Sequence, residues 1–172
     1  MTIELTAMLK TFEDFMELYQ PGDEKNFYGD KSLLGYALAN GDPKARYAIS
    51  SFLLDRGAVG ADIVSEEGYS TLQVLLSRVT HNLKETYELC KRLIELGVDI
   101  NHRDRKYGQV AIQYIARLGG KEEDLQEFYD LWFSQPNLDL ESVDRAGNSP
   151  IEYAKLFNRK EMVRRMEEYE QR

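Results

Sequence analysis

Residues 144–154, Asp-Arg-Ala-Gly-Asn-Ser-Pro-Ile-Glu-Tyr-Ala, decide how this chain is expected to fold. A tight turn around Gly147 precedes the start of a helix. Ser149 is a suitable N-cap, because its hydroxyl can accept a hydrogen bond from an otherwise unpaired backbone N–H. Pro150 then takes the first helical position, where its missing N–H costs nothing. We therefore expect a turn followed by a helix that begins at Pro150.

The same pattern occurs three more times upstream. The four copies begin at Ser32, Ser70, Val110 and Ser149, so their starts are 38, 40 and 39 residues apart. A glycine precedes each copy by two or three residues. An amphipathic helix follows each of the first three copies and ends in a turn such as Gly97-Val98-Asp99-Ile100. Repetition at this period is typical of stacked helical repeats.

These copies resemble the ankyrin repeat, whose pattern is Asp-x-x-Gly-x-Thr-Pro-Leu-His-x-Ala, then a second helix ending Leu-Leu-x-x-Gly-Ala-Asp-Val-Asn. The resemblance covers roughly residues 28–172, and residues 144–154 match best. The period departs from the family, because it is nearer 39 residues than the usual ~33. We place the surplus residues between the paired helices, at 78–82 and 117–121. The family histidine is replaced in the four copies by Gly35, Gln73, Gln113 and Glu152.

The resemblance implies an all-α, single-domain ankyrin-repeat solenoid over residues 1–172. About four helix-turn-helix repeats are expected, at residues 28–63, 64–101, 102–140 and 141–172. Residues 1–27 are expected to form a helical cap, because apolar side chains from Leu5 to Tyr19 form one stripe on a helix that stops at Pro21-Gly22. The last helix, about Lys160–Gln171, carries charged residues on one side, as a terminal repeat requires for solubility.

Composition limits the classes of partner. The formal net charge is -8, which argues against binding to nucleic acid or to an anionic membrane and is compatible with a basic protein partner. The single cysteine excludes an intramolecular disulfide. The chain does not begin with a signal-peptide pattern, and no stretch approaches 18 apolar residues. We therefore expect a cytoplasmic protein.

Few residues could carry chemistry. His81 is expected in an inter-helix loop and His102 after a repeat-ending turn, both at the surface and neither at a metal-ligand spacing from Cys90. Cys90 lies on the apolar side of a helix and is expected to be a buried, inert thiol. The acidic clusters at 66–67 and 122–124 do not flank a cleft, and no phosphate-binding or dinucleotide motif is present. We expect no catalytic residue, metal site or cofactor.

The hairpin tips are the expected binding site. Stacked repeats form an extended concave surface of tips and inner helices, and in ankyrin proteins variable tip residues contact partners. By position, the expected partner-binding residues are Glu66, Glu67 and Tyr69 in the second repeat, Arg105, Lys106, Tyr107 and Gln109 in the third, and Arg145, Ala146 and Asn148 in the fourth. The tips are acidic, basic and mixed in turn, which indicates one specific protein partner with complementary charges.

Three functions remain open on the sequence. The first is a non-enzymatic protein–protein interaction module, acting as a scaffold or regulator. The second follows from a resemblance to small stand-alone bacterial ankyrin proteins of polymorphic toxin systems: an immunity protein that binds and neutralises a cognate toxin, with a basic toxin domain as the partner. The third is an enzyme or small-molecule binder, which would need a deep pocket containing a perturbed titratable group.

Overall fold

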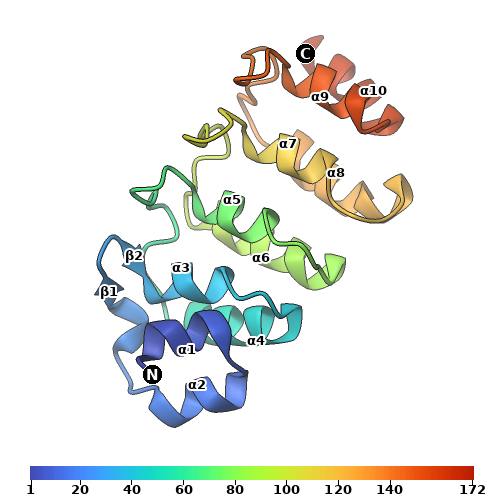
Figure 1. Ribbon diagram of the computed structural model, residues 1–172. Helices are drawn as coiled ribbons and strands as arrows, with labels where there is room; N and C mark the ends of the chain where they lie inside the picture. The colour runs from blue at the N-terminus through green and yellow to red at the C-terminus, as the bar shows by residue number, and fades with distance from the viewer. The chain divides into compact units, whose positions relative to one another are not determined.

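The computed structural model describes residues 1–172 and contains ten α-helices, two short 3-10 helices and one pair of two-residue strands. The chain forms two compact units, Met1–Val98 and Asp99–Arg172 (Figure 1). The mainly helical class expected from the sequence is confirmed. The strand pair was not predicted, so the fold is not strictly all-α.

Unit 1 is built from two layers of helices. Helices α1, α3 and α5 follow one another in one layer, and α2, α4 and α6 form the other. The helices are α1 (Ile3–Leu9), α2 (Phe12–Leu18), α3 (Leu33–Leu38), α4 (Pro43–Asp55), α5 (Thr71–Leu76) and α6 (Leu83–Glu95). A 3-10 turn, Asp23–Lys25, precedes the antiparallel strands β1 (Phe27–Tyr28) and β2 (Lys31–Ser32). Leucine side chains of α3, α4, α5 and α6 fill the space between the layers.

Unit 2 repeats this construction with two helix pairs. Helix α7 packs against α9, and α8 packs against α10. The helices are α7 (Ala111–Ala116), α8 (Gln126–Phe133), α9 (Pro150–Leu156) and α10 (Lys160–Glu170). Residues Glu122–Leu125 form a 3-10 turn before α8. Trp132, which is fully buried, and its neighbours Phe128 and Tyr129 form an aromatic core.

The first helix of each pair begins at the predicted residue. The hydroxyls of Ser32, Ser70 and Ser149 each accept a hydrogen bond from the third helical N–H. Val110 has no hydroxyl, but the side chain of Gln113 accepts from its backbone N–H at 3.0 Å. The side chains of Gln73 and Glu152 make the same reciprocal contact with Ser70 and Ser149. Gln73 and Glu152 therefore complete capping boxes with Ser70 and Ser149.

Gly60 allows the segment after α4 to pass close to the start of α3. Its φ is +84°, a left-handed conformation that favours glycine, and a Cβ here would lie 2.7 Å from Cβ of Ser32. The chain can therefore pass close to the start of α3 only because this position lacks a side chain.

The expectation of one N-terminal helix was wrong. Thr11 begins a second helix, because its hydroxyl accepts from the backbone N–H of Asp14 while the Asp14 carboxylate accepts from the N–H of Thr11. The end of α1 is held from elsewhere in the chain. The Asn40 side-chain amide donates to the carbonyls of Ala7 and Lys10, at 2.9 and 3.0 Å. Part of the predicted apolar stripe, including Leu9, is consequently exposed.

Replacing Asn40 by alanine should destabilise unit 1. Asn40 is only 2% exposed, and its loss would leave buried carbonyls without a donor. We expect the free energy of unfolding in urea to fall by about 2 kcal/mol. Lys44→Ala, at an exposed position of α4, serves as the control and should have little effect. An equal loss in both variants would contradict the capping role of Asn40.

Candidate functional site

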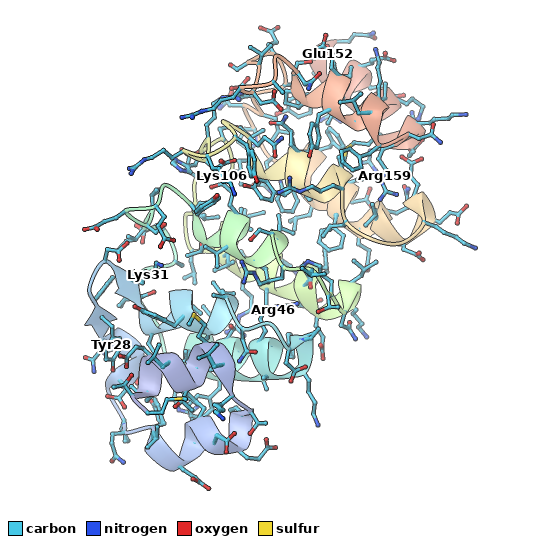
Figure 2. All side chains as sticks on the ribbon, viewed as in Figure 1. Tyr28, Lys31, Arg46, Lys106, Glu152 and Arg159 are labelled. Carbon is cyan, nitrogen blue, oxygen red and sulfur yellow. The ribbon has the colours of Figure 1, made fainter.

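Four hairpin tips precede the helix pairs α3–α4, α5–α6, α7–α8 and α9–α10. They begin at Asn26, Ser65, Asp104 and Asp144, which are 39, 39 and 40 residues apart. A backbone hydrogen bond closes each tip, for example from the N–H of Asp104 to the carbonyl of Gln109 at 3.0 Å. Within each unit, the tips lie at one end of the helix pairs and the inter-helix loops at the other (Figure 1). Figure 2 shows Lys106 on the tip side of unit 2 and Arg159 on the loop side.

Buried carboxylates shape the two tips of unit 2. Asp104 is 2% exposed; its Oδ1 accepts from the N–H of Tyr107 at 2.5 Å, and its Oδ2 accepts from the N–H of Gln109 and the hydroxyl of Tyr114. The Oδ1 of Asp144 accepts from two N–H groups of its own tip, those of Ala146 and Asn148. Burial alone raises the pKa of Asp144, but these hydrogen bonds outweigh burial and lower it. The buried carboxylates therefore hold the backbone of the two tips in place through hydrogen bonds.

The two tips of unit 2 are also joined to each other. The backbone N–H of Arg145 donates to the carbonyl of Tyr107 at 2.9 Å. The side-chain amide of Gln109 donates to Oδ2 of Asp144 at 3.2 Å, while its carbonyl accepts from Arg117. Gln109 is only 7% exposed. Gln109 was expected among the partner-binding residues at the surface, but its side chain is nearly buried and joins the two tips.

The tips of unit 1 are joined by contacts nearer the surface. The carboxylate of Asp30 accepts from the N–H of Glu66 at 2.7 Å. Lys31 forms a salt bridge with Glu67 at 3.2 Å. Sequence reasoning did not select Asp30 and Lys31, although they occupy the same place in the first tip that the selected residues occupy in later ones. The regular spacing of the tips was the signal that could have found them.

Most predicted binding residues lie at the surface. Glu66, Glu67, Arg105, Lys106, Tyr107, Arg145 and Ala146 are exposed, whereas Tyr69 and Asn148 are half-buried. The structure brings Tyr107 and Arg145 together in unit 2, and Glu66 and Glu67 together in unit 1. The tip pair of each unit is thus a rigid backbone that carries exposed charged or aromatic side chains.

Replacing Asp144 by asparagine should destabilise unit 2. The Oδ2 of Asp144 also accepts from the amide of Gln113, at 3.1 Å, so the carboxylate serves four donors in all. Asparagine keeps the shape but turns one acceptor into a donor that faces other donors. We expect the free energy of unfolding in urea to fall by about 2–3 kcal/mol.

Glu141→Gln is the matched control, because it removes one negative charge from an exposed residue near the same tip. It should leave the free energy of unfolding nearly unchanged. If Glu141→Gln costs as much as Asp144→Asn, the effect is one of net charge and the hydrogen-bonding role of Asp144 is refuted.

Arginine side chains organise the opposite end of unit 1. Arg46 is 2% exposed, and its guanidinium donates to the carbonyls of Asn40 at 2.7 Å and Thr80 at 2.5 Å. Arg78 donates to the carbonyl of Ala39 at 3.1 Å. Burial and the nearby Arg78 lower the pKa of Arg46. These bonds tie the α3–α4 loop to the α5–α6 loop, where the surplus residues were predicted.

His81 belongs to this cluster, and the expectation that it is a plain surface residue was wrong. It is half-buried, and both ring nitrogens are hydrogen-bonded: Nε2 to the carbonyl of Arg78 at 2.9 Å and Nδ1 to the hydroxyl of Thr86 at 3.0 Å. A carbonyl can only accept, so Nε2 carries the proton and Nδ1 accepts from Thr86. Burial and the charge of Arg46 lower the pKa of His81.

The stability of unit 1 should therefore depend on pH through His81. An unfolded histidine takes up a proton near pH 6.5, whereas the folded imidazole resists protonation. The free energy of unfolding should be at its full value above about pH 6.5 and fall as the pH drops below it. One proton limits the slope to about 1.4 kcal/mol per pH unit. Urea unfolding between pH 7.5 and 5 measures this slope.

His81→Gln should reduce the slope, while His102→Gln should keep it. Both variants remove one histidine, so they differ only in the environment of the ring. An unchanged slope in His81→Gln would contradict the assignment of the pH dependence to His81.

Unit 2 has the same construction around Arg159. Its guanidinium donates to the carbonyls of Ala116, Leu118 and Gly120 in the α7–α8 loop, at 2.5–3.3 Å. In the reverse direction, the carboxylate of Glu122 accepts from the N–H groups of Glu161 and Met162 in the first turn of α10, at 2.9 and 3.0 Å. Each unit thus has charged residues that fix the tips at one end and the inter-helix loops at the other.

The remaining candidates for a reactive or ligand-binding site are a cysteine, possible metal ligands and a surface depression. Cys90 is fully buried, as predicted, and burial raises the pKa of its thiol. No group of three or more His, Cys, Asp or Glu side chains is arranged to hold a metal ion. A depression beside Arg46, between α4 and α6, has no space for a water molecule. None of the helices has both the length and the apolar character that crossing a membrane requires.

No protein-family model matches the chain, and no curated protein is significantly similar to it. A solved structure is similar over almost the whole length: the crystal structure of a functionally unknown protein from Leptotrichia buccalis C-1013-b. The two share 31% sequence identity and superpose with a TM-score of 0.86, over 98% of this chain and 92% of that one. The chain therefore belongs to the same family as this Leptotrichia buccalis protein.

Proposed function

We propose that this chain is built from ankyrin-like repeats and binds another protein through the hairpin tips of its units, without catalysing a reaction. The observation that carries the proposal is the way the tips are built. Buried Asp104 and Asp144 hold the tip backbone of unit 2, while Arg105, Lys106 and Arg145 extend into solvent. A surface organised before binding loses less conformational entropy when a partner docks.

The repeat assignment is supported by the order of elements within each unit. Each helix pair from α3–α4 to α9–α10 follows a tip, and its first helix begins after the N-cap expected from the period. Gly57 and Gly97 end the second helices of unit 1 with positive φ, as the Gly-x-Asp turn of the ankyrin pattern requires.

A non-catalytic role is supported by the state of the reactive side chains. Cys90 is shielded from solvent, and burial holds it as a thiol. The ring of His81 uses both nitrogens to hold a loop. The carboxylate oxygens of Asp104 and Asp144 accept hydrogen bonds from the backbone of the tips. None of these groups is available to act on a substrate in its present arrangement.

A basic partner is favoured for the tips of unit 1. Asp30, Glu66 and Glu67 lie together there, and Lys31 is the only cation that contacts them in a salt bridge. The negative charge of these tips is complementary to a basic toxin domain, whose toxicity would be blocked by binding. A basic region of a regulated cellular protein has the same chemistry, so the identity of the bound protein distinguishes the two versions.

Photo-crosslinking tests where the partner binds. A photoreactive amino acid placed singly at Glu66, Arg105 or Arg145 should form adducts with a partner protein in cells of the source organism. The same group at Lys91 or Lys160, exposed positions on α6 and α10, should form few or none. Mass spectrometry of the adducts identifies the partner. Suppression of its toxicity by co-expression would distinguish the immunity version from the regulatory one.

Two results would refute binding through the tips. Adducts that form equally well at Lys91 and Lys160 would place the partner elsewhere. The absence of adducts at every tip position would do the same.

A further inference from the structure

We propose that the paired tips of unit 2 bind an acidic segment of a partner protein. This inference rests on the proposed function and names the chemistry recognised by one of its surfaces. The surface is defined by the side chains of Arg105, Lys106 and Tyr107 on one tip and Arg145 on the next, and we call it the basic tip pair.

The four side chains of the basic tip pair are held close together. Arg105, Lys106 and Tyr107 are consecutive in one tip. The hydrogen bond from the N–H of Arg145 to the carbonyl of Tyr107, 2.9 Å long, brings the second tip beside the first. The bond between the Gln109 amide and Asp144 gives a second, buried connection between the same tips. The spacing of the three cations is therefore set by the folded backbone.

The acidic residues of these tips are turned away from solvent. Asp104 and Asp144 are 2% and 5% exposed, and their oxygens accept hydrogen bonds from within the tips. The charged groups that a partner meets on these two tips are therefore the cations. Arg105 and Arg145 form none of the salt bridges in this unit, so their guanidinium groups are open to a new carboxylate.

Arg103 provides the contrast within the same region. Its guanidinium forms a salt bridge with Asp139 at 3.0 Å and donates to the carbonyls of Gly108, Val143 and Ser142. The hydrogen bonds from Ser142 and Arg103 outweigh burial and hold the pKa of Asp139 at about 2. Arg103 therefore has a structural task, and we exclude it from the binding surface.

Tyr107 adds an apolar contact to the charged surface. Tyr107 is 42% exposed, and the ammonium of Lys106 lies 5.0 Å from the centre of its ring. This cation–π contact restricts the Lys106 side chain before any partner arrives. Tyrosine and arginine together are typical of interface hot spots, and the planar guanidinium pairs with a carboxylate through two parallel hydrogen bonds.

A protein segment is favoured over nucleic acid because of the charge of the whole chain. The basic tip pair offers three cations on a protein whose formal net charge is -8. Affinity for nucleic acid depends on neutralising many phosphates along a strand. A short acidic segment needs only the tips themselves and avoids the remaining negative surface.

The test uses a fluorescently labelled peptide of ten glutamates, titrated with the full chain at low salt and followed by fluorescence anisotropy. Wild type should bind, and added salt should weaken the complex. The triple variant Arg105→Glu, Lys106→Glu and Arg145→Glu should bind at least tenfold more weakly. The matched control Lys121→Glu, Lys155→Glu and Lys160→Glu changes net charge equally at exposed positions of the same unit and should bind like wild type. Circular dichroism verifies that both variants are folded.

Two outcomes would overturn the inference. One is a peptide that does not bind wild type, or that binds both triple variants equally weakly. The other is a labelled ten-nucleotide thymidine strand that binds more tightly than the peptide and loses its affinity in the tip variant, which would make nucleic acid the ligand. If crosslinked adducts form at the tips while the peptide fails to bind, protein binding stands and only the acidic chemistry is refuted.

Discussion

Hydrogen bonds between charged side chains and backbone groups hold together the segments that join the helices. A connecting segment cannot use the helical hydrogen-bond pattern, so its buried N–H and C=O groups need other partners. Carboxylates of Asp104 and Asp144 serve the amides of the tips in unit 2. Guanidinium groups of Arg46 and Arg159 serve the carbonyls of the inter-helix loops, one in each unit. In both cases the buried charge is compensated by peptide dipoles.

The sequence predicted those elements whose signals are local. N-caps such as Ser70 and Ser149 set the helix starts, because the capping residue and the N–H it serves are neighbours in the chain. The split of the N-terminal helix also has a local signal in Thr11 and Asp14. The apolar stripe across the break concealed it, since both halves have helical spacing. The short strand pair at residues 27–32 depends on a tight turn and was not predicted.

The candidate site was only partly predictable, because some of its contacts join residues that lie far apart in the sequence. Exposure of Glu66, Glu67 and Arg105 follows from their place at the crest of a turn. The burial of Gln109 depends on Asp144, which is 35 residues further along the chain, and no local pattern indicates that contact. The same holds for His81, whose pKa is lowered by burial and by the charge of Arg46 on α4, 35 residues away in the chain. A polar residue that hydrogen-bonds to a distant part of the chain is predicted to lie at the surface when only its local sequence is considered.

The inter-helix loop of residues 77–82 has a consequence for how such repeats vary in length. Val79 is 99% exposed, while its neighbours are anchored: Arg78 donates to the carbonyl of Ala39 and Thr80 to that of Gly41. The anchors fix where the loop leaves and rejoins the helices and leave its crest unconstrained. Lengthening a flexible loop adds free energy only slowly, so residues could be added at Val79 at small cost while the helices stay in place. The spacing between successive helix pairs is then a property of the anchors, and the number of residues per repeat is free to drift.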